Sequence, residues 1–516
     1  MHRTCVMPRS LVLMFFRAGL SSARSDETEG FGSNLRTGRG QPDSEKTPMR
    51  RYIFILLFFI TLVTPFLLRL GMGKSSHVTI GGKQDTLIII TAHFEGIRRE
   101  FAEAFTDWHR QKFGQPAYVD YRFYGGSDTV KYFDDIARAK APIDVDLVWG
   151  GGDYLFDQQL KKPGYLEAIQ LDANVMETAY PKPDLNGVAL YDKSNPPAWF
   201  GSALSSFGIL YNKDVLKYLG VPEPKTWRDL ADPKYRGWLV MADPTRSASA
   251  KTVFMVITER AMADAKAAGR SEDEGWAIGM GLVRQLAANA RLFTGSSEAI
   301  PGIVASGDAA AAMCIDFHGR AQVDAIGEDR MGYIEPVGAT AINPDPIALV
   351  KGAPHRELGI RFIEFVLTPQ AQRLWNTRVG APGGPKETAL RRLPIVPSVY
   401  AHAENFTDKV KPFEQAGGFN TSSTRKKTFT LLGELIEFSC IDLLDELRET
   451  RAAILSSPRA TELDARLGRF PFDQKEAIKR ASEWSIAGPA RRLELQRTWT
   501  DEFRGEYRKM KVEAKP

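Results

Sequence analysis

The stretch from Leu87 to Trp108 reads LIIITAHFEGIRREFAEAFTDW, and it decides the fold class. Its first five residues form a continuous apolar run, which is typical of a strand buried on both faces of a parallel sheet. The residues that follow place Ile97, Phe101 and Phe105 on one face at helical spacing. A buried strand followed at once by an amphipathic helix predicts the first half of a βαβ unit.

The same pattern continues along the chain. Tyr118–Tyr124 alternates apolar and polar side chains as a second strand, a short helix follows Gly125, and Val145–Trp149 is a third strand. This βαβαβ order predicts an α/β protein with a doubly wound sheet. Further strands are expected at Phe207–Tyr211, Trp238–Ala242, Ala309–Ile315 and Ile347–Val350, with helices at Ala250–Ala267 and Leu358–Leu367. Beyond about residue 400, charged helical patterns at Leu431–Leu455 and Asp473–Met510 predict an all-α extension.

Length and composition indicate a globular protein with more than one domain. The 516 residues exceed what one core usually holds, and 43% hydrophobic with 25% charged residues is ordinary. The net charge of +5 comes without a basic run that interleaves aromatic residues, so we expect no nucleic-acid partner. The three cysteines show no disulfide or metal-ligand spacing, and we expect Cys314 and Cys440 to be small core residues.

The N-terminal region carries an export or membrane signal. Arg50 and Arg51 precede Tyr52–Leu68, an apolar run without a charge. Because no small-x-small cleavage pattern follows, we expect residues 49–73 to be an uncleaved membrane anchor, with a cleaved signal peptide as the alternative. The arginine pair would stay in the cytoplasm and direct the rest of the chain outward. Residues 1–48 are interpreted as a non-structural leader, with Met49 as the true start.

Ligand chemistry is expected at the ends of the predicted strands, because ligands of open parallel sheets bind beyond the carboxyl ends of the strands. The loops there are rich in glycines and hydroxyls, which donate hydrogen bonds, and several precede predicted helices. The candidate ligand-binding residues in and beside these loops are Thr91, His93, Ser127, Gly151, Asp153, Ser206, Thr245, Arg246, Ser247, Ser249, Ser296, Ser297 and Asp316.

Simpler interpretations stay open for some of these residues. Ser247 and Ser296 also suit the N-caps of the helices that follow them. The run Gly150–Gly152 also suits a tight turn, and His93 also suits a hydrogen-bonded structural role. The chain has no GxxxxGK[ST], GxGxxG, GxSxG or HExxH motif, and we expect no enzymatic activity and no cofactor. Asp316 and His318 are metal-ligand types, but their spacing alone does not predict a metal site.

One segment resembles a known family. Pro224–Pro244 reads PKTWRDLADPKYRGWLVMADP, with Ser247 beyond it. This is similar to a motif of the bacterial extracellular solute-binding proteins, a class that includes iron(III)-, phosphonate-, sugar-phosphate-, thiamine- and polyamine-binding members. The resemblance runs from about Thr86 to Val379. Supporting pieces are TAH at 91–93, DLVWGGG at 146–152, FGILYNKDVL at 207–216, IALVKGAPH at 347–355 and FIEFVLTPQAQ at 362–372.

The resemblance implies a two-lobed periplasmic-binding-protein fold of type II, in which two crossover strands join the lobes. Lobe one would comprise residues 85–200 and 338–400, lobe two residues 201–337, and the helical C-terminal extension residues 401–516. The crossovers would lie near Trp199–Ser206 and Gly338–Asp345. The implied function is the solute-binding component of an ABC importer at the periplasmic face of the membrane, with a permease and an ATPase complex as partners.

The chemistry of the strand-end loops favours a small anionic solute, phosphorylated or phosphonate-bearing. Hydroxyls, backbone amides and Arg246 are suited to a phosphate or carboxylate. Asp153 and Asp316 also suit the amines of a polyamine. The family's iron-binding members use neighbouring tyrosines where this chain has Ile315–His318, which argues against tyrosinate iron binding. Three alternatives remain: a polyamine or iron(III) transport receptor, a membrane-tethered binding module of a signalling system, and an exported enzyme.

Overall fold

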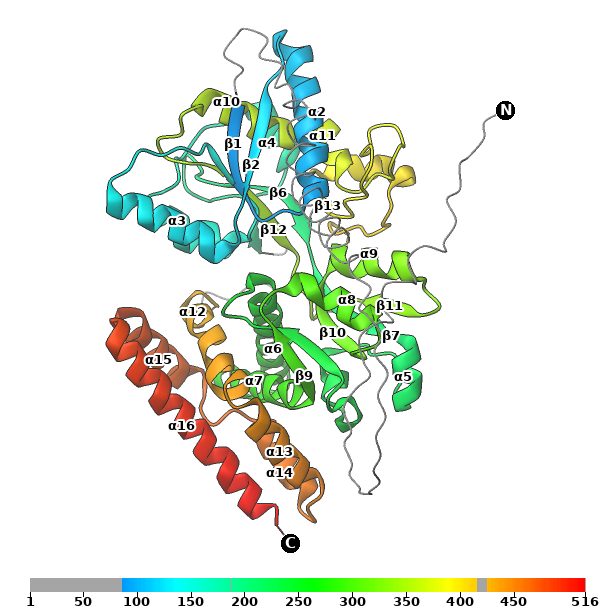
Figure 1. Cartoon of the computed structure of the whole chain (residues 1–516), viewed down its shortest axis with the longest axis vertical. Helices are drawn as coiled ribbons and strands as arrows, with labels where there is room; N and C mark the ends of the chain where they lie inside the picture. The colour runs from blue at the N-terminus through cyan, green and yellow to red at the C-terminus, as the bar shows by residue number, and fades with distance from the viewer. Residues whose placement is uncertain (1–85, 186, 415–424, 516) are drawn as a thin grey trace, which may run out of the picture. The chain divides into compact units, whose positions relative to one another are not determined.

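Two mixed β-sheets carry the fold in the computed structural model, which describes residues 86–185, 187–414 and 425–515 (Figure 1). The strand order is β13-β6-β12-β3-β1-β2 in one sheet and β11-β7-β10-β8-β9 in the other. The first sheet contains β1 (Thr86–Thr91), β2 (Tyr118–Phe123), β3 (Leu147–Trp149), β6 (Phe200–Ser205), β12 (Asn343–Leu349) and β13 (Leu393–Pro394). We call this sheet and the helices packed on it lobe one.

Helices cover both faces of the first sheet, which is why β1 is apolar along its whole length. Leu87 and Ile89 pack into one core cluster with α2 and α10, whereas Ile90 packs into another with Phe133 of α3. The elements of lobe one outside the sheet are α2 (Glu95–Phe113), α3 (Gly126–Ala139), the π-helical turn η1 (Leu155–Lys161), α4 (Ala173–Ala179), the hairpin β4 (Asp184–Leu185) with β5 (Val188–Ala189), α10 (Arg356–Val366), α11 (Pro369–Leu374) and η5 (Pro397–Asn405).

The second sheet and its helices form lobe two. Its strands are β7 (Phe207–Asn212), β8 (Leu239–Ala242), β9 (Ala290–Thr294), β10 (Ala311–Ile315) and β11 (Met331–Ile334). Its helices and 3₁₀ turns are α5 (Lys213–Leu219), η2 (Trp227–Ala231), η3 (Pro233–Tyr235), α6 (Ala248–Ala267), α7 (Glu272–Asn289), η4 (Ser297–Ala299), α8 (Ile300–Ala305) and α9 (Asp316–Ile326). The capping box of Thr226 and Asp229 begins η2, which places Trp227 in the core.

The two sheets share one connection pattern. In each, three parallel strands, β2-β1-β3 or β9-β8-β10, adjoin an antiparallel strand, β12 or β7, beyond which lies β6 or β11. The chain passes between the lobes through Ser206, which joins β6 to β7, and through residues 335–342, which join β11 to β12. The prediction of two doubly wound lobes of periplasmic-binding-protein type II is confirmed.

Two lobe boundaries differ from those expected. Residues 201–205 belong to β6 and pair with β12 in the first sheet, although the sequence analysis assigned them to lobe two. Phe406 packs in the core of lobe one, although the C-terminal extension was expected to begin at residue 401. The reason in both cases is pairing between segments that are distant along the chain: β6, which reads FGSALS, pairs with β12, and Phe406 forms a bridge with Thr377.

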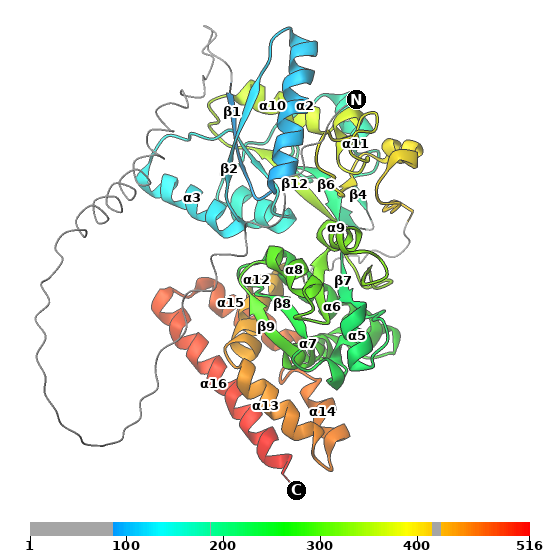
Figure 2. The same cartoon turned by 45° about the vertical axis from the view of Figure 1, so that its right-hand side comes forward.

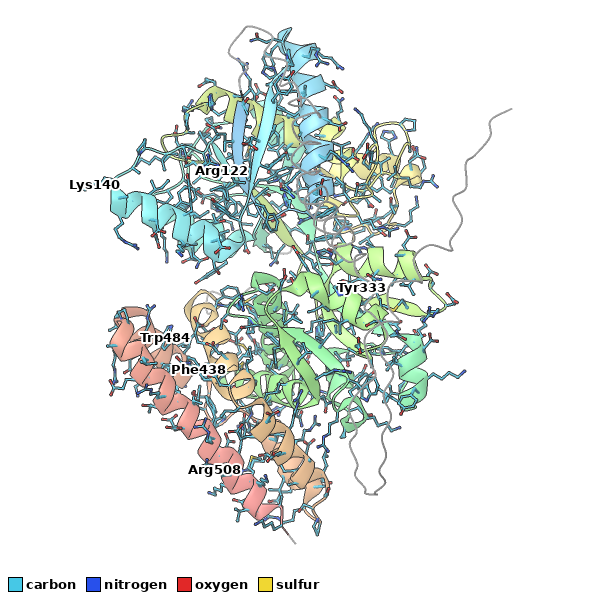
Figure 3. The ribbon with its side chains drawn as sticks, viewed as in Figure 1. Arg122, Lys140, Tyr333, Phe438, Trp484 and Arg508 are labelled. Atoms are coloured by element: carbon cyan, nitrogen blue, oxygen red, sulfur yellow. The ribbon has the colours of Figure 1, made fainter. Side chains whose placement is uncertain are left out.

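The C-terminal region is all-α, as predicted, and packs on lobe two. Its elements are α12 (Arg425–Ile436), the π-helical turn η6 (Glu437–Ile441), α13 (Leu444–Leu455), α14 (Ala460–Leu467), α15 (Gln474–Ile486) and α16 (Pro489–Glu513). Figure 2 shows α13 and α14 beside α7, and α16 beside α13. Phe438 of η6 and Trp484 of α15, labelled in Figure 3, pack with ring centroids 5.6 Å apart. Leu435, Leu447 and Phe503 share one core cluster with Val253 and Leu286 of lobe two. We call residues 425–515 the C-terminal helical segment.

The predicted leader (residues 1–48) and the predicted anchor or signal (residues 49–73) lie outside the described residues. In the part of the chain that the structure describes, no helix is both long enough and apolar enough to cross a membrane. Cys314 and Cys440 are buried free thiols, in agreement with their expected place in the core.

Candidate functional site

Asp345 ties together the loops that follow β1 and β3. Its Oδ2 lies 2.7 Å from Nε2 of His93 and 2.8 Å from a guanidinium nitrogen of Arg392, and its Oδ1 accepts a 3.0 Å hydrogen bond from the Gly151 amide. Thr91 adds a second tie, because its hydroxyl donates to the Trp149 carbonyl over 2.7 Å. The ends of the two strands are therefore held in one fixed arrangement.

Charge at this junction is concentrated on Asp345 and Arg392. Burial alone would raise the pKa of Asp345, but Arg392 and then His93 hold that pKa well below its usual range. Burial lowers the pKa of His93, although Asp345 opposes the shift. His93 is therefore a neutral donor to an ionised carboxylate, and its ring packs edge-on against Trp149 with centroids 4.6 Å apart.

The backbone conformation of the loop after β3 requires glycine at three consecutive positions. Gly150, Gly151 and Gly152 have φ values of 90°, 111° and 84°, a region that side chains rarely allow. A Cβ on Gly150 would also lie 2.8 Å from Nε2 of His93. The chain bends at Gly151, and the bend brings the Gly151 amide to Asp345.

A second group of candidate residues meets at the carboxyl ends of β8 and β9 in lobe two. The amide and hydroxyl of Thr245 donate to Oδ1 of Asp243 over 2.8 and 2.6 Å. Ser247 caps α6 by accepting from the Ala250 amide, and Ser296 caps η4 by accepting from the Glu298 amide. The loops are joined because the Asp243 amide donates to the Thr294 carbonyl.

Arg246 is the exposed cation of this group. A Cβ on Gly295 would lie 2.9 Å from a guanidinium nitrogen of Arg246, so the side chain lies flat against the loop that carries Ser296 and Ser297. Ser249, in the first turn of α6, and Ser297, on the loop after β9, are half-buried, and Ser296 is exposed.

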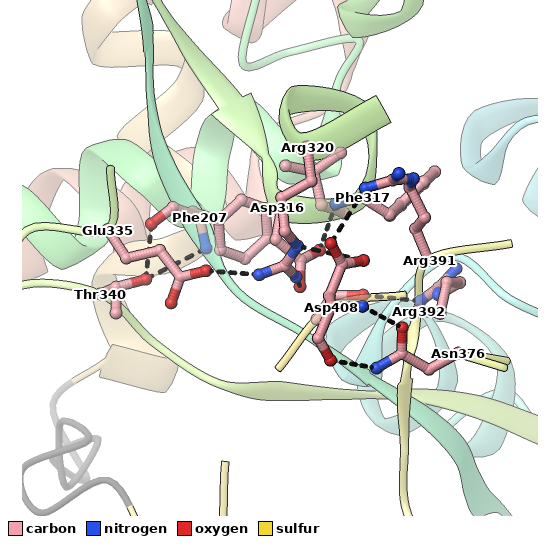
Figure 4. A network of polar contacts seen from close by, with 12 residues as sticks. Phe207, Asp316, Phe317, Arg320, Glu335, Thr340, Asn376, Arg391, Arg392 and Asp408 are labelled. Carbon is pink, nitrogen blue, oxygen red and sulfur yellow. Dashed lines mark hydrogen bonds and ion pairs between the residues drawn. The ribbon is translucent and has the colours of Figure 1, made fainter. Parts of the chain in front are cut away.

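The second crossover is held by a network of charges (Figure 4). Arg320 of α9 pairs with Asp316, with Glu335 at 3.0 Å and with Asp408 of lobe one at 3.7 Å. Arg391 of lobe one bonds Asp408 at 3.0 Å and Asp324 of α9 at 2.7 Å. Burial raises the pKa values of Glu335 and Asp408, and Arg320 opposes both shifts. These ion pairs connect α9 to lobe one beside the crossover.

The predicted site residues thus fall into separate places. Thr91, Ser206 and Asp316 are buried and present almost no surface to solvent. The Asp316 carboxylate accepts a hydrogen bond from the Phe317 amide and forms an ion pair with Arg320. His93 and the Gly151 amide are engaged by Asp345. The candidates that are exposed or half-buried at strand ends are Ser127, Asp153, Thr245, Arg246, Ser249, Ser296 and Ser297.

Sequence reasoning missed Arg392 and the aromatic residues around it. Phe94 of lobe one stacks on Phe317 of lobe two with ring centroids 6.3 Å apart, and the Arg392 guanidinium lies 4.9 Å from the Phe317 ring. Burial, then Arg392, lowers the pKa of the neighbouring His318 to about 4. Arg392 also donates to the Ser205 hydroxyl over 2.7 Å. Its only signal in the sequence is the pair Arg391-Arg392, which nothing local connects to the strand ends.

The described residues contain no group of three or more histidine, cysteine, aspartate or glutamate side chains that could hold a metal ion. Two lobes with this strand order, joined by two crossovers and with strand-end loops on each, define the periplasmic-binding-protein fold of type II. The predicted family resemblance is confirmed: residues 153–395 match the model of the bacterial extracellular solute-binding proteins.

Relatives and solved structures are similar over part or most of this chain. The phosphoglycerate transport regulatory protein PgtC of Salmonella typhimurium is 24% identical over 172 residues, which are 33% of this chain and 39% of PgtC. The iron uptake protein A1 of Synechocystis is 26% identical over 243 residues, 45% of this chain and 59% of that protein. The chain therefore matches less than two thirds of the length of either relative.

Two solved structures share the fold. The periplasmic binding protein AfuA of Actinobacillus pleuropneumoniae, with fructose-6-phosphate bound, has a TM-score of 0.51 at 18% identity and covers 70% of this chain and 100% of its own. The substrate binding protein of the ABC transporter from Agrobacterium tumefaciens has a TM-score of 0.51 at 14% identity and covers 72% of this chain and 96% of its own.

Proposed function

We propose that this protein is the solute-binding component of an ABC importer and captures a small solute between lobe one and lobe two. The observation that carries the proposal is the pair of strand-end loop groups, one on each lobe, with the lobes joined by two crossovers. A solute that contacts both groups is bound best when the lobes are closed, so binding shifts the population toward the closed form. A permease and ATPase complex would recognise that form. The protein binds its solute without turning it over.

The solute is a small anion that carries a phosphate or phosphonate. Two features support this class: the exposed Arg246 and the capped N-terminus of α6 that follows it. AfuA holds fructose-6-phosphate and PgtC is named for phosphoglycerate, which agree with this choice. The acidic Asp153 would contact hydroxyls on the other half of the solute.

The expected location is the periplasmic side of the cytoplasmic membrane. The Arg50-Arg51 pair and the apolar run Tyr52–Leu68 support attachment through that segment. The family match to extracellular solute-binding proteins supports export.

Thermal-shift screening of the purified full chain tests the solute class. We expect stabilisation by at least one of fructose 6-phosphate, 3-phosphoglycerate, a phosphonate or inorganic phosphate, and none by spermidine or ferric citrate. Arg246→Ala should weaken the binding of that anion about tenfold or more, because a charge-assisted contact is lost. Arg236→Ala, which removes an exposed arginine outside the strand-end loops, should leave the affinity unchanged. Stabilisation by spermidine alone would overturn the anion assignment, and an unaffected Arg246→Ala would remove Arg246 from the site.

A second candidate is a binding module that reports solute to a signalling system. The name of PgtC, a transport regulatory protein, favours it. Uptake of the labelled anion by cells with and without the protein separates the two. Loss of uptake with the permease still expressed supports the transport receptor, whereas unchanged permease activity with loss of an expression response supports the signalling module.

A further inference from the structure

The C-terminal helical segment touches the strand-end loops of both lobes through one side chain. The ring of Phe429, on α12, lies 4.3 Å between centroids from the ring of Tyr154. Tyr154 follows directly after the Gly150–Asp153 loop of lobe one. On the other side, the Lys251 ammonium lies 5.5 Å from the centre of the Phe429 ring, and Lys251 is in the first turn of α6, next to Ser247 and Ser249.

The position of Phe429 is set by how tightly α12 packs on lobe two. A Cβ on Gly433 would lie 2.8 Å from Cε of Lys251 and 3.2 Å from the Pro244 carbonyl, so the α12 backbone rests directly on the loop between β8 and α6. Leu432 and Leu435 belong to the core cluster of lobe two. Phe429 itself is 5% exposed. It therefore moves with lobe two rather than as a free side chain.

Tyr154 is the lobe-one half of the contact. It is a half-buried residue whose ring packs against the core cluster of lobe two, although its own chain segment belongs to lobe one. The π-helical turn η1 begins at Leu155, and the π-helical turn η6 begins at Glu437, directly after α12. Such turns are rare in proteins, and those that occur are often found at functional sites. A π-helical turn thus follows each contact residue along the chain, directly after Tyr154 and at the end of α12.

The charges around Phe429 are mixed. Lys251 faces Glu434, whose pKa is raised by burial and lowered in part by Lys251. Thr245 holds the Asp243 carboxylate in place on the same loop. This side of the loops presents the half-buried Tyr154 ring, one ammonium and carboxylates, which suit the hydroxyl-bearing carbon skeleton of a solute rather than its phosphate.

We propose that α12 is a third wall of the solute site, and that Phe429 packs on Tyr154 when the lobes close and separates from it when they open. The C-terminal segment then takes part in solute capture and favours the closed form. An aromatic pair of this kind shifts the ratio of closed to open protein by about two- to tenfold. The inference rests on the proposed capture of a solute between the lobes.

Cross-linking tests the contact without any solute. Tyr154→Cys and Phe429→Cys are combined in the full chain with Cys5→Ser, Cys314→Ala and Cys440→Ala, which remove all three native thiols. A short bismaleimide should join the two new thiols within one molecule, detected as a linked peptide pair by mass spectrometry. The control combines Tyr154→Cys with Ile486→Cys, whose residue is 86% exposed in the same segment, and should not link. If each single cysteine reacts but the 154/429 pair never links, the contact does not form in solution and the proposal is wrong.

Solute binding tests the wall. Phe429→Ala should weaken binding of whichever anion stabilises the full chain in the thermal-shift screen, by about two- to tenfold, and Phe429→Tyr should restore it. Ile486→Ala is the matched truncation and should bind as the wild type does. If the 154/429 pair links but Phe429→Ala binds with unchanged affinity, α12 is not a wall of the solute site. The proposed transport-receptor function would still stand. Binding of no probe by the wild type would instead remove the receptor function, and the wall with it, whatever the cross-link shows.

Discussion

At the scale of single residues, Asp345 connects the loops of the candidate site in lobe one. It lies between two prolines on β12, is 7% exposed, and satisfies three partners that come from different parts of the chain. A buried charge of this kind is tolerated because Arg392 pairs with it, and each partner depends on the other. The contacts of this carboxylate hold the loops after β1 and β3 together.

Asp345→Asn should lower the free energy of unfolding by about 3–5 kcal/mol, because it leaves the buried Arg392 without its counter-charge. Urea unfolding followed by circular dichroism measures the change. The control is Asp324→Asn, which also removes the partner of an arginine but at a side chain that is 71% exposed, and should cost less than about 1 kcal/mol. Equal effects of the two substitutions would show that Asp345 does not organise the strand ends.

Glu437 makes stability depend on pH in the C-terminal segment. Burial, and then Asp442 and Asp243, raise its pKa from 4.5 to about 7. Between these values the folded state binds more protons than the unfolded state, so the contribution of Glu437 falls as pH rises through about 7. Glu437→Gln should therefore raise the melting temperature near pH 8 and leave it unchanged near pH 4.5.

The control for Glu437→Gln is Glu449→Gln, which changes an exposed residue of α13 that forms an ion pair with Lys511. This substitution should not raise the melting temperature at alkaline pH. A Glu437→Gln variant that gained nothing at alkaline pH would show that its carboxylate ionises normally in the folded protein.

At the scale of elements, the interface between α7 and the C-terminal helices shows how the segment is held. Arg451 of α13 donates to the Gln285 carbonyl over 2.8 Å, to Oδ1 of Asn289 over 3.0 Å and to the Ala231 carbonyl over 2.7 Å. A cation at the C-terminal end of α7 satisfies carbonyls that the helix leaves unpaired. In the opposite direction, Arg284 of α7 donates hydrogen bonds to the Leu467 and Arg469 carbonyls of the C-terminal helical segment.

Gly281 is the point where α7 and the segment approach most closely. A Cβ there would lie 2.1 Å from the carbonyl carbon of Gly468, a backbone atom that cannot move aside. Gly281→Ala should therefore separate the helices and lower the free energy of unfolding by about 1–3 kcal/mol, measured by urea unfolding. Gly505→Ala, in the exposed face of α16 with nothing within 4 Å of its Cβ, should stabilise by about 0.5–1 kcal/mol. The same sign for both substitutions would contradict the packing described.

At the scale of the whole molecule, the C-terminal helical segment and lobe two share one hydrophobic core. The apolar faces of α6 and α7 are covered on one side by the second sheet and on the other by the C-terminal helices. The segment is therefore a layer of lobe two and not an appendage, and the charges at the second crossover then link that lobe to lobe one.

Deleting residues 425–516 should expose the apolar side chains of α6 and α7, among them Met262 and Leu286. We expect a melting temperature lower by more than about 10 °C, or a chain that no longer accumulates in soluble form, since several kcal/mol of burial are lost. Differential scanning calorimetry of both proteins measures this. A truncated chain that melts as the full chain does would show that the segment folds independently.

Strand and helix positions were predictable from the sequence because their signals are local. The run LIIIT, the helical spacing after it and the Pro224–Pro244 motif each lie within a few turns of chain, and the structure has the strands and helices that they predict. β6 was not recognised as a strand of the first sheet, because FGSALS has little strand character until β12 pairs with it. The caps at Ser247 and Ser296 were predictable for the same local reason, whereas the network around Arg320 joins residues that are far apart along the chain.

The sequence by itself determined the α/β class, the family resemblance, the glycine turn after β3 and the all-α character of the C-terminal region, since each depends on neighbours along the chain. Tertiary structure alone decided that Asp345 would engage His93, Gly151 and Arg392, and that α12 would reach Tyr154. These contacts depend on the positions in space of the ends of the strands and helices. A buried charge or ring acquires its role from partners hundreds of residues away, and no local pattern encodes such a partner.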